Sequence, residues 1–380
     1  MVLEQAMKRK IRLYVHMPFC VQKCLYCDFL SWHDSRENQA RYVQALCREI
    51  RACQGRYPAR VSSLFFGGGT PSVLEPGHMA EIMEALAEVF SFEPDSEMSI
   101  EANPGTVNLE KLRTYEKIGL NRISFGLQSA HNEELKALGR IHTWEEFLES
   151  YDLARQAGFD NINVDLMSGI PDQTLASWQK TLSRVLELAP EHVSAYSLIV
   201  EEGTPFAQRK LNLPEEEEER RMYEMTAEML GSQGYRQYEI SNYALPQREC
   251  AHNMGYWMRD DYLGLGLGAA SLFDSQRWNN TDSMEEYLEK SERPEEIQVC
   301  REKLSVREQM EETMFLGLRM TEGIERERFQ EEFGISVEEV YGDALRRLEG
   351  LGLLQADRGR IYLTRKGISL SNQVFVEFLL

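Results

Sequence analysis

The segment Tyr14-Val-His-Met-Pro-Phe-Cys20-Val-Gln-Lys-Cys24-Leu-Tyr-Cys27-Asp-Phe29 places three cysteines at spacings of four and three residues. It directly follows residues 11–16, a β-rich run that predicts the first strand. Three thiolates on so short a loop can surround a compact metal centre. Iron–sulfur clusters are normally held by four cysteines, so three ligands leave one iron open for chemistry on a bound molecule. A zinc ion with His16 or His33 as fourth ligand is the alternative that spacing alone leaves open.

Short β-rich runs alternate with helix-length amphipathic segments through the first half of the chain. The predicted strands are 11–16, 63–66, 98–101, 122–126, 162–167 and 192–198. The predicted helices are 36–54, 77–90, 108–118, 143–157 and 174–188, the last beginning at Thr174 as N-cap. This alternation indicates parallel βαβ units in an α/β fold. Because polar residues and glycines cluster at the carboxyl ends of the strands, we predict a partial (β/α)6 barrel rather than a doubly wound sheet.

The alternation weakens beyond about Gly203. A helix is predicted at 215–230, and residues 235–280 are rich in Tyr, Asn, Gly and Trp. Helical segments at 305–318, 325–333 and 337–350 precede a strand–turn–strand pattern at 353–367, which predicts a C-terminal α+β winged-helix-like module. We therefore divide the chain into a barrel core (1–236), a connecting region (237–300) and the C-terminal module (301–380).

The composition of the chain limits the kinds of partner and the cellular compartment that we expect for it. The net charge of −20 argues against a nucleic-acid partner, because phosphate binding needs a basic surface. The predicted module carries more acidic than basic residues, so a packing or lid role is expected rather than DNA binding. No run approaches the ~18 apolar residues of a membrane span, and no signal peptide is recognisable. With seven cysteines, an odd number, a reducing cytoplasm is the expected location.

A second motif, Gly67-Gly68-Gly69-Thr70-Pro71, ends the second predicted strand. Glycines let the backbone approach a ligand closely, although a plain tight turn would use the same residues. Together with the cysteine loop, this turn resembles the radical S-adenosylmethionine (SAM) superfamily. In that superfamily three cysteines, here Cys20, Cys24 and Cys27, hold a [4Fe–4S] cluster. SAM chelates the open iron, the glycine turn (here Gly68, Gly69 and Thr70) receives its amino group, and an electron from the cluster yields a 5′-deoxyadenosyl radical.

Four further stretches narrow the resemblance to oxygen-independent coproporphyrinogen III oxidases and their relatives, over nearly the whole chain. They are IEANPGT (100–106), RISFGLQSA (122–130), LGRIH (138–142) and NVDLMSGIP (163–171). The resemblance implies that Tyr14 lies near SAM, Tyr26 beside its nucleotide, and that Glu101 accepts hydrogen bonds from it. It also implies that Gln128, Arg140 and Asp165 match positions that line a second SAM site in the oxidase. From the residues alone, helix caps (Glu101, Asp165), a surface ion pair (Arg140) and core packing (Tyr14) remain open.

Two departures separate the chain from the oxidases themselves. The oxidase loop has an additional cysteine two residues past the third, and this chain has Phe29 at that position. The oxidase also has a longer N-terminal arm, whereas about ten residues precede the first predicted strand here. His252-Asn-Met-Gly-Tyr256-Trp257 fits the HNxxYW pattern of the family's heme-chaperone branch, as do the length and Cys27-Asp28-Phe29. A histidine can ligate heme iron and aromatic rings can pack on the macrocycle. A buried, hydrogen-bonded His252 would be the structural alternative, and Cys250 is a weaker ligand candidate.

We therefore expect a heme chaperone that carries a SAM-liganded [4Fe–4S] cluster. It would bind heme with His252, accept electrons from a donor and transfer heme to an acceptor apoprotein. No residue is assigned a catalytic role. The alternatives are a coproporphyrinogen III oxidase, another radical SAM enzyme that modifies a porphyrin, and a zinc-bound interaction module, which the glycine turn and the polar strand ends disfavour.

Overall fold

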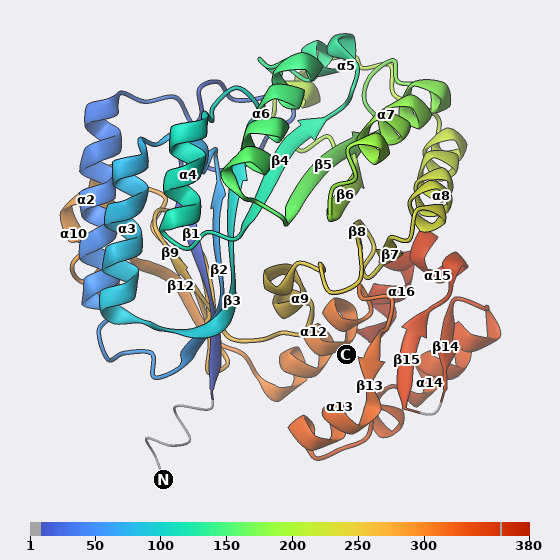
Figure 1. Cartoon of the computed structure of the whole chain (residues 1–380). Coiled ribbons are helices and arrows are strands. Elements are labelled where there is room, and N and C mark those ends of the chain that lie inside the picture. The colour runs from blue at the N-terminus through green and yellow to red at the C-terminus, as the bar shows by residue number, and fades with distance from the viewer. Residues whose placement is uncertain (1–8, 358) are drawn as a thin grey trace.

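The computed structural model describes residues 9–357 and 359–380. Most of the leading arm considered for a signal peptide, residues 1–8, and Arg358 of the predicted turn lie outside the described residues. Figure 1 shows an open, curved sheet with helices packed on its outside and a smaller module below it.

Six parallel strands form the core of the large sheet in the order β1 to β6, and the predicted α/β partial barrel is confirmed. The strands are β1 (Lys10–Met17), β2 (Arg60–Gly68), β3 (Ser91–Ala102), β4 (Arg122–Gln128), β5 (Ile162–Ser168) and β6 (His192–Ser197). The outer helices are α2 (Arg36–Ala52), α3 (Pro76–Val89), α4 (Leu109–Lys117), α6 (Trp144–Ala157), α7 (Leu175–Glu187) and α8 (Glu216–Ser232).

Local sequence explains why these segments form where they do. All seven residues of β4 are buried, as expected for a parallel strand covered on both faces. Helix α7 begins at Thr174, whose side chain accepts the backbone N–H of Ser177, as predicted. Helix α6 has a capping box between Thr143 and Glu146. The short helix α5 (Asn132–Ala137) was not predicted.

The region 237–300 extends both edges of the sheet. Beside β6 lie β8 (Asn242–Ala244) and β7 (Arg236–Gln237). Beside β1 lies the parallel strand β9 (Tyr262–Leu265), followed by β10 (Ala270–Phe273), β11 (Gln276–Asn280) and β12 (Gln298–Lys303). Between β8 and β9 runs α9 (Ala251–Trp257), and after β11 come α10 (Met284–Lys290) and α11 (Pro294–Ile297). Strands of the connecting region thus continue the main sheet; the boundaries at 236 and 300 stay a prediction.

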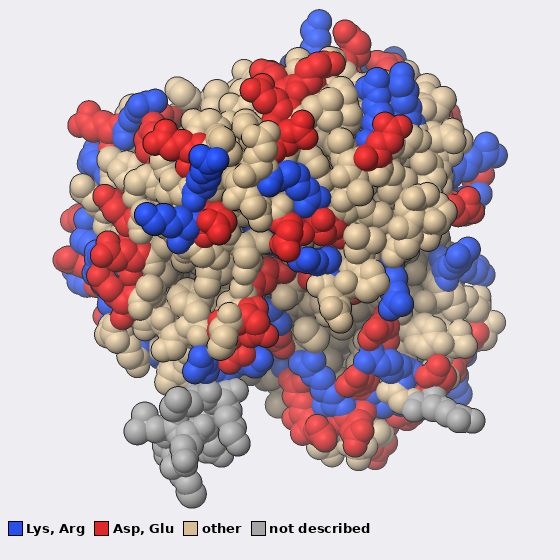
Figure 2. Space-filling view, viewed as in Figure 1, with Lys and Arg blue, Asp and Glu red and all other residues tan. Residues whose placement is uncertain are grey.

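The C-terminal module has its own core and its own three-stranded sheet, ordered β13-β15-β14. Its elements are α12 (Val306–Gly317), β13 (Ile324–Glu325), α13 (Arg326–Phe333), α14 (Val337–Gly350), β14 (Leu354–Ala356), β15 (Arg360–Leu363), α15 (Arg365–Ser369) and α16 (Ser371–Phe375). Three helices followed by a two-stranded wing give the predicted winged-helix-like arrangement. Acidic and basic side chains are mixed over the face shown in Figure 2. Among the described helices, none combines the length and apolar character that crossing a membrane requires.

Candidate functional site

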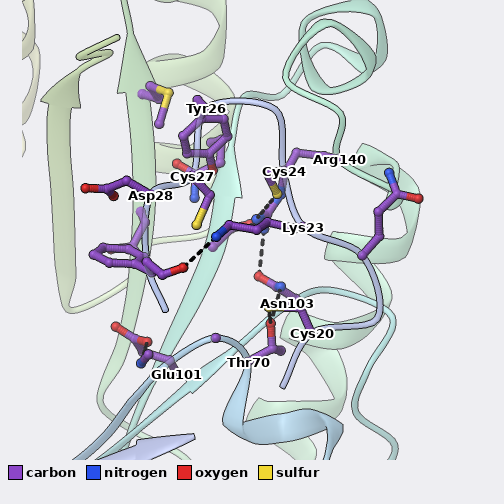
Figure 3. A pocket seen from close by; sticks show the side chains of 18 of the residues that line it. Cys20, Lys23, Cys24, Tyr26, Cys27, Asp28, Thr70, Glu101, Asn103 and Arg140 are labelled. Atoms are coloured by element: carbon purple, nitrogen blue, oxygen red, sulfur yellow. Dashed lines mark hydrogen bonds between the residues drawn. The ribbon is translucent and has the colours of Figure 1, made fainter. Parts of the chain in front are cut away.

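The cysteine loop lies at the carboxyl end of β1 and lines a cavity of about 310 Å³ (Figure 3). Backbone hydrogen bonds hold the loop at its start and between its second and third cysteines. Cys20 N–H donates to the Trp32 carbonyl at 3.0 Å, and Leu25 N–H donates to the Leu138 carbonyl at 3.0 Å. All three cysteines are free thiols that line this cavity. The site therefore sits where barrel enzymes place theirs, beyond the carboxyl ends of the strands.

The thiols do not converge on one point. Within residues 9–357 and 359–380, no three His, Cys, Asp or Glu side chains lie close enough together to hold a single metal ion. His16, the fourth zinc ligand considered, has both ring nitrogens engaged, with the Tyr14 hydroxyl at 3.1 Å and the Leu30 carbonyl at 2.9 Å. Three separated thiols without a fourth ligand fit three corners of a cluster better than one zinc ion.

A relay of hydrogen bonds connects two of the cysteines through residues of three other loops. Arg140 Nη1 donates to the Cys24 sulfur at 3.4 Å, and its Nη2 donates to Asn103 Oδ1 at 2.7 Å. Asn103 Nδ2 donates to Thr70 Oγ1 at 2.8 Å, which in turn lies 3.4 Å from the Cys20 sulfur. Figure 3 shows this chain of contacts along one wall of the cavity. Cys24 and Cys20 are thereby positioned by residues that follow β2 and β3 and by the loop between α5 and α6.

Asn103 was not singled out from the sequence. It stands two residues after Glu101 in the stretch IEANPGT, where only the carboxylate drew attention. An asparagine at a strand end is also a common turn residue, so its dual hydrogen-bonding role carries no local signature. The role of Asn103 is visible only in the structure, where its side chain accepts a hydrogen bond from Arg140 of a different βα unit.

Backbone hydrogen bonds connect the glycine turn to the start of the cysteine loop. Gly69 N–H donates to the Met17 carbonyl and Thr70 N–H to the Phe19 carbonyl, both at 2.8 Å. Gly68 has a φ of +111°, and a Cβ there would lie 2.5 Å from the His16 ring. The close approach of two backbones, together with this left-handed conformation, explains the run of glycines.

Two half-buried carboxyl groups, Glu101 of β3 and Asp165 of β5, face the cavity. Glu101 accepts the N–H of Gly68 at 3.2 Å, and burial, reinforced by Asp165, raises the pKa of Glu101 to about 8. Burial also raises the pKa of Asp165, which accepts hydrogen bonds from Ser124 at 3.1 Å and Asn163 at 2.7 Å. Acceptors of this kind can hold the amino and hydroxyl groups of a bound ligand.

Gln128, Arg140 and Tyr26 complete the rim of the same cavity. Gln128 has a φ of +72° and accepts the Tyr196 hydroxyl at 3.0 Å. Tyr26 packs against Phe206 with ring centroids 6.4 Å apart. Phe29, at the position of the oxidases' additional cysteine, also lines the cavity, and 64% of its side chain is exposed. The cavity thus combines three thiols, four carboxyl groups (Asp28, Glu101, Asp165 and Glu201), the ammonium of Lys23 and the guanidinium of Arg140. This set of groups fits an iron–sulfur cluster and a polar ligand such as SAM.

Tyr14 and His252 lie apart from the cysteines, in an adjoining inner cavity of about 280 Å³ that shares Gly68, Glu101 and Asp165 with the first. His252 is buried and stacks on Phe65 with ring centroids 5.2 Å apart. Its Nδ1 is 3.0 Å from the Ser63 hydroxyl, and its Nε2 is 3.0 Å from the Tyr256 hydroxyl. Burial and two arginines lower its pKa to about 3, so the ring is neutral with both nitrogens engaged. Ligation of heme iron by His252 stays a prediction, and it would require one of these bonds to break.

Comparison with known proteins agrees with this geometry. The family model described as "Radical SAM superfamily" matches residues 14–185, and "HemN C-terminal domain" matches residues 304–370. The chain is 37% identical to "Heme chaperone HemW" of Lactococcus lactis over 371 residues, 97% of both chains. It is 36% identical to the protein of the same name from Bacillus subtilis over 372 residues, 96% of this chain and 98% of that one.

The fold has a counterpart among solved structures. The structure titled "Coproporphyrinogen III oxidase (HemN) from Escherichia coli is a Radical SAM enzyme" superposes with a TM-score of 0.87 at 26% identity, covering 100% of this chain and 92% of that one. Radical SAM domains imply a [4Fe–4S] cluster and SAM, which the thiols and polar groups of the cavity fit. The nearly full-length identity to the bacterial relatives places this chain in the HemW family of the radical SAM superfamily.

Proposed function

We propose that this protein is a heme chaperone that carries a SAM-liganded [4Fe–4S] cluster and delivers heme to an acceptor apoprotein. The observation that carries the proposal is the identity of 37% over 97% of both chains to a relative named a heme chaperone. One feature of the site supports the chaperone over the oxidase: Phe29 lines the cavity at the position where the oxidases have an additional cysteine.

The cluster ligands in this proposal are Cys20, Cys24 and Cys27. Support comes from their common cavity and from the relay through Arg140 that holds Cys24. When bound, a reduced cluster of this type supplies an electron to SAM. The chain's own residues would orient SAM: the Glu101 and Asp165 carboxyl groups would accept hydrogen bonds from it, and the Arg140 guanidinium would pair with its carboxylate. The remaining contacts assigned to SAM are Tyr14, Tyr26, Gly68, Gly69, Thr70 and Gln128.

The proposal includes partners and a compartment. Heme is the cargo, an apoprotein without heme is the acceptor, and an electron donor reduces the cluster. A reducing compartment such as the cytoplasm suits the seven free thiols and an oxygen-sensitive site.

Anaerobic reconstitution tests the function. The protein is purified without oxygen, its cluster is rebuilt with iron and sulfide, and heme or coproporphyrinogen III is added with SAM and reductant. We expect stoichiometric heme binding, followed by transfer to an added apocytochrome, and no turnover of the porphyrinogen. Absence of heme binding by the wild-type protein would refute the proposal.

Coproporphyrinogen III oxidation is the second candidate, and the TM-score of 0.87 to that oxidase favours it. The carboxyl groups of Glu101 and Asp165 and the guanidinium of Arg140 would suit a reactive SAM site equally well. The same experiment separates the two candidates, because formation of protoporphyrinogen identifies an enzyme.

A further inference from the structure

A third cavity, of about 400 Å³, lies between the barrel and the C-terminal module. Its walls come from β7, α9, α12 and β13, and among the described residues it shares no lining residue with the two cavities of the barrel. Helix α9 contacts both β2 and α12, and Figure 1 shows it between the sheet and the module. The volume is within the range of sites that take small-molecule ligands.

Helix α9 divides the HNxxYW motif between two cavities. His252, Asn253 and Tyr256 line the inner cavity of the barrel, whereas Trp257 lines the cavity beside the module. This split follows from helical spacing, because residues three and four apart share a face. The motif's tryptophan thus belongs to a site that its histidine does not reach.

The wall around Trp257 is apolar and rich in sulfur. Met254, Met258, Met320 and Ile324 line it together with the indole. Trp257 Nε1–H is buried and has no hydrogen-bond partner among the described residues. A buried indole donor without a partner is uncommon and points to a group that is absent from the protein itself. The guanidinium of Arg319 lies 4.3 Å from the centre of the ring and backs it from outside.

The rim of the cavity is charged. It holds Arg236, Arg328 and Arg360 as well as the carboxylates Glu249, Glu322 and Glu325. Arg360 is paired with Glu322 and Glu325, which accounts for two of the three acids. Arg236 is exposed and forms no ion pair or side-chain hydrogen bond within the described part of the chain. An apolar wall with an unpaired arginine at its edge suits a flat apolar ligand that carries carboxylates.

We infer that heme binds in this cavity between α9 and the C-terminal module, with its macrocycle against Trp257 and the methionines and a propionate at Arg236. The inference rests on the proposed function, since it locates the cargo of the chaperone. Three thioethers on the wall are potential axial ligands, as methionine is in some cytochromes. The Tyr238 hydroxyl, by contrast, is engaged by His192 at 2.8 Å and Cys250 N–H at 3.2 Å. A site open to solvent and placed between two parts of the chain would also allow release to an acceptor.

Heme titration of the full-length, cluster-loaded protein tests the location. Met258→Glu places a carboxylate in the wall and should weaken heme binding by about tenfold or more, because burying an unpaired charge costs free energy. Arg236→Glu should weaken it by a smaller factor without affecting the fold, since Arg236 is exposed. Arg346→Glu, on the exposed face of α14, makes the same charge change away from the cavity and should bind heme like the wild type.

Two substitutions in the inner cavity of the barrel test whether heme binds there instead. The inference competes with the expectation that His252 ligates heme iron. If heme binds beside Trp257 instead, His252→Ala and the milder Tyr256→Phe bind heme with wild-type affinity and retain the cluster spectrum. If they lose heme while Met258→Glu and Arg236→Glu retain it, heme binds on the other face of α9 and the inference is wrong. If the wild-type protein itself binds no heme, both the proposed function and this location for heme are refuted. If the wild type and all four variants bind alike, only the location is refuted.

Discussion

Replacing Asn103 with leucine removes both side-chain hydrogen bonds at the centre of the relay between Cys24 and Cys20. One bond is made with the charged Arg140 at 2.7 Å and the other with Thr70 at 2.8 Å. A hydrogen bond to a charged group contributes about 1.5–3 kcal/mol and a neutral one about 0.5–1.5 kcal/mol. We therefore expect the Asn103→Leu variant to lose about 2–4.5 kcal/mol of unfolding free energy. We also expect its cluster to form incompletely, because Cys24 and Cys20 are no longer linked.

Chemical denaturation and the visible absorbance of the reconstituted cluster measure the two effects separately. Asn121→Leu is the matched control. Asn121 also makes two side-chain hydrogen bonds, with Met98 N–H at 2.8 Å and the Ser96 carbonyl at 2.9 Å, but it does not line the cavity. It should destabilise the protein and leave the cluster intact. Asn103→Asp should restore the cluster, because a carboxylate can still accept from Arg140 and Thr70. Full cluster content in Asn103→Leu would refute the reasoning.

Three further predictions concern stability and the cluster itself. Burial raises the pKa of Glu49 from 4.5 to about 7, so the folded state holds this proton more tightly. The contribution of Glu49 to the free energy of unfolding should therefore fall as the pH rises from about 5 to about 7 and then level off. Glu49→Gln should remove this part of the pH profile, and a profile that the substitution leaves unchanged would contradict the assignment. Gly68→Ala should destabilise the protein in denaturation, since the new Cβ meets the His16 ring at 2.5 Å. Gly55→Ala is its control, with a φ of +71° but no neighbouring atom within 4 Å, and equal losses would show that the contact is unimportant. Cys24→Ser should abolish the cluster absorbance, and a full cluster in this variant would show that Cys24 is not a ligand.

Local patterns were sufficient for much of the fold. The alternation of β-rich and amphipathic segments predicted β1 to β6, because buried parallel strands and capped helices are encoded within windows of a few residues. The cysteine spacing and the glycine turn located the cavity, since each motif follows directly on a strand end. In the region 237–300 the sequence pattern did not predict individual strands. Its strands β9 to β12 are short and join the edge of the sheet one after another, β9 by pairing with β1 and each later strand by pairing with the one before it.

The sequence by itself identified the chemical groups expected at the site: three thiols, a glycine turn, the carboxyl groups of Glu101 and Asp165 and the guanidinium of Arg140. Tertiary structure alone decided what each group contacts. Arg140 reaches Cys24 across 116 residues, and Asn103 becomes important only between Arg140 and Thr70. Likewise, His252 and Trp257 are neighbours in one motif, but the packing of α9 directs them into different cavities. Long-range contacts of this kind depend on the assembled sheet and module, and no local window of sequence contains them.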